Sequence, residues 1–129
     1  MTSNPDQAQA GSGEPPVDFE QLRAAGNDDP ELLRELVKLY FDQAREVMGG
    51  LTAAVQKRSA PETDYLAHKL VGASLACGMT AMVAPLRELE SRGRKGDLAG
   101  AEDLLAQAVS RLELVRAAVD EFLRNPASQ

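Results

Sequence analysis

The sequence is poor in aromatic residues and in the residues that form covalent cross-links. Aromatic side chains make up 4% of its 129 residues, tryptophan is absent, and there is one cysteine. A lone cysteine excludes an internal disulfide and suits a reducing compartment, so we expect a cytoplasmic protein. The scarcity of aromatic residues, together with abundant Ala and Leu, favours helices packed by aliphatic side chains over a β-sheet.

The sequence also lacks a basic excess and a long hydrophobic run. Its formal net charge is −6, which argues against nucleic acid or an anionic membrane as a partner. No apolar run approaches the roughly 18 residues that a transmembrane helix needs. The first 16 residues have neither the basic nor the apolar region of a signal peptide.

The composition along the chain predicts one domain between two tails. The hydrophobic content of 43% is enough for a single core. Residues 1–16 are rich in Gly, Pro, Ser, Gln and Asn, which predicts a disordered tail, and residues 125–129 form a short C-terminal tail. The domain therefore spans residues 17–124. The initial Met and the tail lead us to expect a free-standing protein, and the charged exterior leads us to expect a monomer.

Hydrophobic spacing predicts an all-α fold. Asp29 is a candidate N-cap, and Pro30 suits the first helical position that follows it. We predict turns at residues 59–61 and a loop at residues 92–96. The predicted helices span residues 17–25, 30–57, 62–76, 80–91 and 98–123. Short loops between long amphipathic helices favour an antiparallel up-down four-helix bundle, with the short N-terminal helix capping one end.

The only histidine, His68, is the most informative residue of the chain. At about 100° per residue, Leu66, Leu70, Ala73 and Cys77 lie opposite His68 and are predicted to be buried. The face of the helix that carries His68 is predicted to carry Asp64, Tyr65, Val71, Gly72 and Leu75. Exposed apolar residues around a polar group suggest a modest docking patch, although a lone histidine on a solvated helix usually has no function.

The glycine beside His68 has two interpretations. Gly72 either leaves room for the close approach of a partner or marks a close crossing with another helix of the same chain. In both cases a glycine inside a helix costs about 1 kcal/mol relative to alanine, so the cost does not separate the two.

The segment from Ala67 to Glu90, AHKLVGASLACGMTAMVAPLRELE, resembles the histidine-containing phosphotransfer (HPt) domain. The family pattern is AH-x-L-K-G-[SA]-[SA], followed by a glycine near the helix end and a closing L-E or Q one helix later. Residues that match in register are Ala67, His68, Leu70, Gly72, Ala73, Ser74, Gly78, Leu89 and Glu90. Residues 29–44, DPELLRELVKLYFDQA, also resemble the second helix of the family, and the resemblance extends over residues 17–124.

One position departs from the pattern. The family usually has a lysine three residues after the histidine, where this chain has Val71. Lys69 lies about 100° away around the helix and supplies only general positive potential. Support for the phosphoryl group is therefore expected from the partner or from Arg92, Arg94 and Lys95, with Arg94 the residue that we single out.

The resemblance implies a mechanism. His68 would attack the aspartyl phosphate of a response-regulator receiver domain and pass the phosphoryl group to a second receiver. Glu90 would hydrogen-bond Nδ1 of His68 and leave Nε2 to react. Lys69, Val71, Gly72, Leu75, Asp64 and Tyr65 would contact the partner. Expected partners are receiver domains and a hybrid histidine kinase. The chain itself would need no cofactor, since the receiver supplies Mg²⁺.

The sequence also bears on other classes of function. No Gly-rich nucleotide loop or Walker-type lysine is present, so we expect a phosphocarrier without kinase activity of its own. The main alternative is a non-catalytic adaptor that binds receivers through the same face without using His68. A ferritin-like metal site needs inward-facing Glu-x-x-His pairs, and a hydrolase needs a triad; one outward-facing histidine meets neither requirement.

Overall fold

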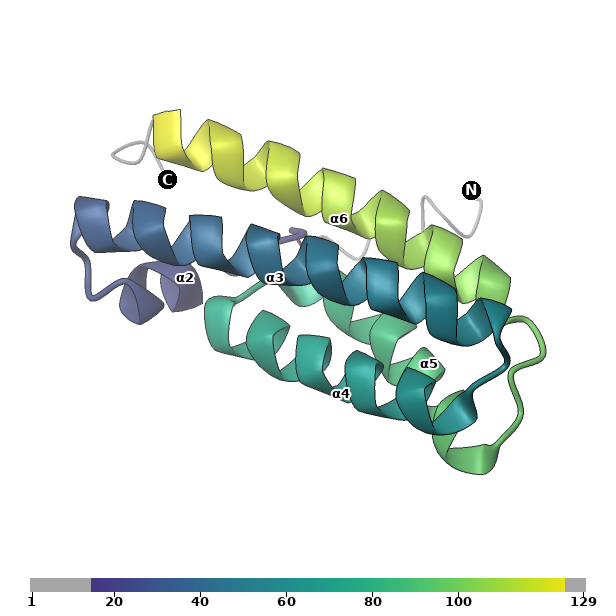
Figure 1. Ribbon diagram of the computed structural model, residues 1–129. Helices are drawn as coiled ribbons and strands as arrows, with labels where there is room; N and C mark the ends of the chain where they lie inside the picture. Colours follow the sequence, from purple (N-terminus) through teal and green to yellow (C-terminus); the bar gives the residue numbers. More distant parts are fainter. Residues whose placement is uncertain (1–14, 125–129) are drawn as a thin grey trace, which may run out of the picture.

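The computed structural model describes residues 15–124, and within that range the chain forms helices and short connections (Figure 1). The elements in order are α2 (Phe19–Ala25), α3 (Pro30–Gln56), α4 (Ala60–Cys77), the 3₁₀ turn η1 (Thr80–Met82), α5 (Val83–Lys95) and α6 (Ala101–Arg124). None of these helices is both long and apolar enough to cross a membrane.

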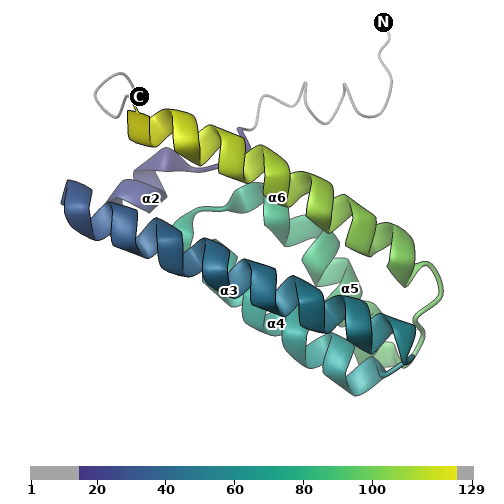
Figure 2. The same ribbon diagram turned by 45° about the horizontal axis from the view of Figure 1, so that its top comes forward.

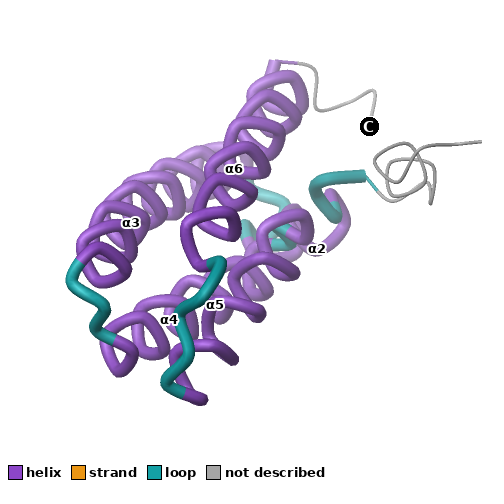
Figure 3. The backbone as a smooth tube through the Cα atoms, turned by 90° about the vertical axis from the view of Figure 1, so that its right-hand side faces the viewer, coloured by secondary structure: helices purple, strands orange, loops and turns teal. Residues whose placement is uncertain are grey.

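The four long helices form an antiparallel bundle with short connections between them (Figure 1). Each packs on its neighbour in the chain, and α6 returns to pack on α3. The most extensive contact is between α4 and α5. Figure 3 views the bundle toward the end where the α3–α4 and α5–α6 connections lie. The arrangement confirms the all-α, up-down four-helix bundle predicted from the sequence.

The short helix α2 caps the opposite end of the bundle, as predicted. It lies where α6 ends (Figure 2) and packs against α4 and α3. The Phe19 ring stacks on the Phe122 ring of α6, with centroids 4.8 Å apart. This ring contact and the fully buried Leu22 hold α2 against the bundle.

The ends of the helices follow from local capping chemistry. Oδ1 of Asp29 accepts a hydrogen bond from the backbone amide of Glu31 at 3.0 Å, and Pro30 occupies the first helical position. Both predictions at this start are confirmed. Helices α4 and α5 end at Gly78 and Gly96, which both adopt φ of 75°, a left-handed conformation that favours glycine.

The core is largely aliphatic, and a hydrogen-bonded polar pair lies within it. Fully buried large side chains include Leu22, Leu51, Leu70, Leu86, Leu89, Val115, Val119 and Phe122. Between α3 and α4, the Tyr40 hydroxyl and Ser74 Oγ share a hydrogen bond of 2.7 Å, and burial raises the pKa of Tyr40 to about 12. Cys77 is also buried, which raises the pKa of its thiol and fits the interpretation as a small core residue.

Several predicted boundaries were wrong around α5. Residues 92–95 are helical, not a loop, because α5 continues to Lys95 and Gly93 is buried. The last helix begins at Ala101 rather than at residue 98. Leu98 packs into the core from the connection, so its burial extended the apparent hydrophobic stripe beyond the helix.

Three other starts also differ from prediction. Helix α2 begins at Phe19 rather than at residue 17, because Asp18 is its N-cap. Helix α4 begins at Ala60, where a turn was expected, because Pro61 is well tolerated in the first helical turn. The helix expected from residue 80 begins as η1, and α5 follows at Val83. Pro85 therefore lies in the first turn of α5, where its missing amide costs no hydrogen bond.

The folded part begins before residue 17. The Pro16 carbonyl accepts a hydrogen bond from the Ala81 amide at 3.0 Å, and the Asp18 amide donates to the Gly78 carbonyl at 2.7 Å. The tail predicted for residues 1–16 was therefore too long at its end, while residues 1–14 and 125–129 lie outside the described part of the chain.

Candidate functional site

His68 lies midway along α4 with its ring in solvent. Its side chain is 74% exposed, as the helical wheel predicted, whereas Ala67 and Leu70 beside it are fully buried. The packing of these two neighbours fixes the backbone that carries His68. The imidazole therefore projects into solvent from a packed stretch of helix.

Glu90 of α5 holds one edge of the imidazole. Its Oε2 lies 2.6 Å from Nδ1 of His68, and the Glu90 side chain is only 8% exposed. An ionised carboxylate only accepts hydrogen bonds, so this contact requires the proton on Nδ1. In the neutral ring, Nε2 then carries the lone pair, and no other described residue bonds to the ring. The contact expected from the resemblance is present.

Arg94 completes the polar cluster around Glu90. Its Nη2 donates to the same Oε2 atom of Glu90 at 2.8 Å and lies 3.7 Å from Oδ1 of Asp64 on α4. Arg94 occupies this place because α5 extends past the predicted end, which puts residues 90 and 94 one turn apart on one face. The guanidinium thus offsets the buried carboxylate beside His68.

The other two cations singled out near this loop lie elsewhere. The Arg92 guanidinium bonds to Glu88 at 3.2 Å and to the carbonyl of Ala99, so it ties α5 to the connection that follows. Lys95 is exposed and forms no ion pair among the described residues. Of the three, Arg94 alone is bonded to Glu90.

Most of the predicted partner face surrounds His68 as expected. Tyr65 and Leu75 are 65% and 47% exposed, Lys69 is exposed and Asp64 is half-buried. A Cβ added to Gly72 would have no neighbour within 4 Å. A close helix crossing is therefore excluded as the reason for Gly72, and the glycine leaves an open notch beside the imidazole.

The placement of Val71 on this face was wrong. Val71 is 4% exposed and belongs to the core. The helical periodicity assumed a buried face centred opposite His68, but α5 packs on the flank of α4 that carries Asp64 and His68, so the buried region extends further around the helix. The side chain that replaces the family's usual lysine is therefore part of the packing between helices and contributes no polar group to the site.

Gly93 is a residue of the site region that the sequence interpretation missed. It is buried on α5, and a Cβ there would lie 2.6 Å from the Asp64 amide nitrogen and 2.7 Å from the Ala60 carbonyl oxygen. The sequence did contain a signal, because a glycine inside a helix is destabilising and often marks the close approach of another part of the chain. The neighbouring Arg-Gly-Arg-Lys-Gly run resembled a loop and obscured it.

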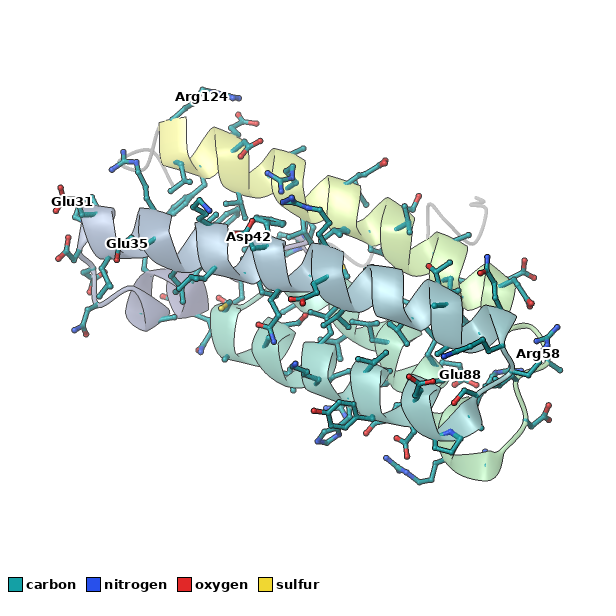
Figure 4. The ribbon with its side chains drawn as sticks, in the orientation of Figure 1. Glu31, Glu35, Asp42, Arg58, Glu88 and Arg124 are labelled. Atoms are coloured by element: carbon teal, nitrogen blue, oxygen red, sulfur yellow. The ribbon has the colours of Figure 1, made fainter. Side chains whose placement is uncertain are left out.

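Charge is distributed unevenly over the bundle. Among the described helices, α5 alone carries more basic than acidic residues, although the whole chain has a net charge of −6. Acidic side chains such as Glu31, Glu35 and Asp42 lie along α3 (Figure 4). The Lys38 ammonium and the nearby arginines lower the pKa of Asp42. The helix that contributes Glu90 and Arg94 therefore carries a local excess of basic residues.

Across residues 15–124, no cluster of three or more His, Cys, Asp or Glu side chains is arranged to hold a metal ion.

The chain is similar to known proteins over most of its length. A family model described as the Hpt domain matches residues 35–123, which include His68 and Glu90. A crystal structure of histidine-containing phosphotransfer protein B from Pseudomonas aeruginosa PAO1 superposes with a TM-score of 0.79 and 24% sequence identity, covering 85% of this chain and 96% of that one. At this identity the superposition shows a common fold. No curated protein matches the sequence.

Proposed function

The chain belongs to the Hpt domain family, whose function is histidine phosphotransfer within phosphorelays, and we propose that His68 is the residue through which it relays the phosphoryl group. His68 is the only histidine of the chain. The observation that carries the proposal is an exposed imidazole whose Nδ1 is held by a nearly buried carboxylate, so that the reactive lone pair of Nε2 points away from the bond to Glu90.

In the proposed reaction, Nε2 attacks the phosphorus of an aspartyl phosphate on a receiver domain. The P–N bond forms as the P–O bond to the aspartate breaks, and the aspartate leaves as a carboxylate. The Nδ1 proton stays on the ring, and the resulting positive charge lies beside the Glu90 carboxylate. A carboxylate of a second receiver then takes the phosphoryl group and restores neutral His68. Positioning and charge stabilisation do most of this work.

Hpt domains interact with receiver domains and kinases in phosphorelays. For this chain we propose a hybrid histidine kinase and receivers as partners, a monomeric state and a cytoplasmic location. Mg²⁺ is proposed to come with the receiver, whose phosphoryl group it would neutralise.

The proposed docking surface consists of Tyr65, Lys69, Gly72 and Leu75 around His68, with Asp64 at its edge. Gly72 supports this choice because open space, not another helix, lies beside it. Val71 is left out of the surface because it is buried.

Arg94 is the proposed source of positive charge in place of the missing lysine. Its side chain is 65% exposed and its guanidinium is bonded to Glu90, so it lies next to the ring that would carry the phosphoryl group. Lys69 adds general positive potential from the same helix as His68.

The test measures acid-labile ³²P on the protein after mixing with a ³²P-labelled receiver domain, comparing wild type with His68→Gln. We expect label on the wild type and none on the variant, with equal helical content by circular dichroism. Receiver binding without label on the wild type would contradict the proposal and support the non-catalytic adaptor.

A further inference from the structure

We propose that Gly93 is a positioning residue for His68: its missing side chain lets α5 approach α4 closely enough for Glu90 to reach the imidazole. The inference rests on the proposed role of His68 as the phosphoryl carrier. Gly93 would thus determine the geometry of the site without touching any of the reacting atoms.

The contact between α4 and α5 at Gly93 is a backbone-to-backbone contact. An added Cβ would lie 2.6 Å from the Asp64 nitrogen, 2.7 Å from the Ala60 oxygen and 3.0 Å from the Asp64 Cα. None of these atoms belongs to a flexible side chain that could move aside. Any side chain at position 93 therefore requires the two helices to separate or to shift along each other.

This crossing lies about one turn away from the His68–Glu90 contact on both helices. On α4, Asp64 precedes His68 by four residues, or about 6 Å of helix. On α5, Glu90 precedes Gly93 by three residues, or about 4.5 Å, and the helices are antiparallel. The distance between the α4 and α5 backbones at Gly93 therefore largely determines the distance between the backbones at His68 and Glu90.

The His68–Glu90 contact has little slack to absorb a displacement. Bringing the added Cβ out to ordinary van der Waals distance requires a shift of about 0.8 Å. The same shift would lengthen the present 2.6 Å contact to roughly 3.4 Å, close to the limit of a hydrogen bond. Glu90 is 8% exposed and its Oε2 is also held by Arg94, so its side chain has limited freedom to follow the ring.

The test compares Gly93→Ala with Gly49→Ala as the matched control. Both glycines lie inside helices, but an added Cβ at Gly49 on α3 meets nothing within 4 Å. The two variants are monitored by circular dichroism, by ¹⁵N chemical shifts of the imidazole nitrogens, and by phosphorylation with phosphoramidate. This small donor transfers its phosphoryl group to an imidazole nitrogen with release of ammonia and needs no protein docking.

We expect Gly93→Ala to remain helical and to react roughly 10- to 100-fold more slowly than the wild type, because displacements of about 1 Å near a reacting group have costs of this size. Its imidazole ¹⁵N shifts should move toward a mixture of tautomers, a change that a purely structural role would not produce. Gly49→Ala should match the wild type in both rate and spectrum.

A double variant tests whether Gly93 acts through Glu90. Gly93→Ala combined with Glu90→Ala should react no more slowly than Glu90→Ala alone. Full additivity of the two effects, wild-type shifts and rate in Gly93→Ala, or loss of its helical content would each overturn the proposal. A wild type that phosphoramidate leaves unphosphorylated on His68 would instead contradict the proposed function, while the ¹⁵N shifts would still test the role of Gly93.

Discussion

Replacing Glu90 tests how far the reactivity of His68 depends on one hydrogen bond. The bond between Nδ1 and Oε2 is 2.6 Å long and involves a carboxylate that is almost fully buried. Hydrogen bonds to charged groups contribute about 1.5–3 kcal/mol, which corresponds to a factor of roughly 10 to 100 in rate. Glu90→Ala removes both the acceptor and the charge that offsets the phosphorylated ring, so we expect phosphorylation by phosphoramidate to slow by that factor.

The stability of the same variant should change little. Arg94 loses its main partner, but its side chain is 65% exposed and Asp64 lies 3.7 Å away. Water can therefore solvate the guanidinium, and the loss of a buried carboxylate removes a desolvation cost. A large loss of rate with a nearly unchanged melting temperature distinguishes an orienting role from a structural one.

Two further variants sharpen the measurement. Glu90→Gln keeps an acceptor for Nδ1 without the charge, and its rate should lie between those of wild type and Glu90→Ala. Glu88→Ala, two residues away on α5, removes an exposed carboxylate bonded to Arg92 and should react like wild type. A Glu90→Ala rate within twofold of wild type would refute the reasoning.

Two other predictions concern the docking notch and the buried hydroxyl. A Cβ added at Gly72 meets nothing within 4 Å, so the fold of Gly72→Gln should persist. Its phosphorylation by phosphoramidate should be retained while transfer from a receiver falls at least about tenfold, and normal receiver transfer would rule out the notch. Tyr40→Phe removes a hydroxyl whose pKa is raised to about 12 by burial, whereas the unfolded chain ionises near 10. Below pH 10 the phenol stays protonated in both states, whereas between pH 10 and 12 only the unfolded chain ionises readily, which lowers the stability of the wild type by about 2–3 kcal/mol. At neutral pH, Tyr40→Phe should be about 1 kcal/mol less stable than wild type because it loses the bond to Ser74. Urea unfolding from pH 7 to 11.5 should then show that its free energy of unfolding declines less steeply with pH than that of the wild type. Parallel pH profiles would contradict this.

The parts of the fold that depend on local chemistry could be predicted from the sequence. The cap at Asp29, the left-handed end at Gly78 and the exposure of His68 all follow from residues within a turn or two of each other. The contact between Glu90 and His68 joins residues 22 positions apart. It was expected from the resemblance to a family, since spacing alone does not determine which helices are neighbours.

The errors arose where the packing of one helix on another decides the outcome. Val71 is buried on a helix whose flank at Asp64 and His68, placed in solvent by the helical periodicity, packs against α5. The last turn of α5 forms despite Gly93 because burial of that glycine against α4 outweighs its poor helix propensity. The helical position of Arg94, and with it the bond to Glu90, depends on that same turn.

The hydrogen bond between Nδ1 of His68 and Glu90 has a consequence for the order in which donor and acceptor bind. With Nδ1 bonded to Glu90, only Nε2 remains to react, and it is reached across a single face of the bundle. A donor and an acceptor that both need this atom cannot be bound at the same time. Transfer would then follow ping-pong kinetics without a ternary complex. Each partner would act as a competitive inhibitor of the other, and the ratio of their concentrations in the cell would govern the net flux through His68.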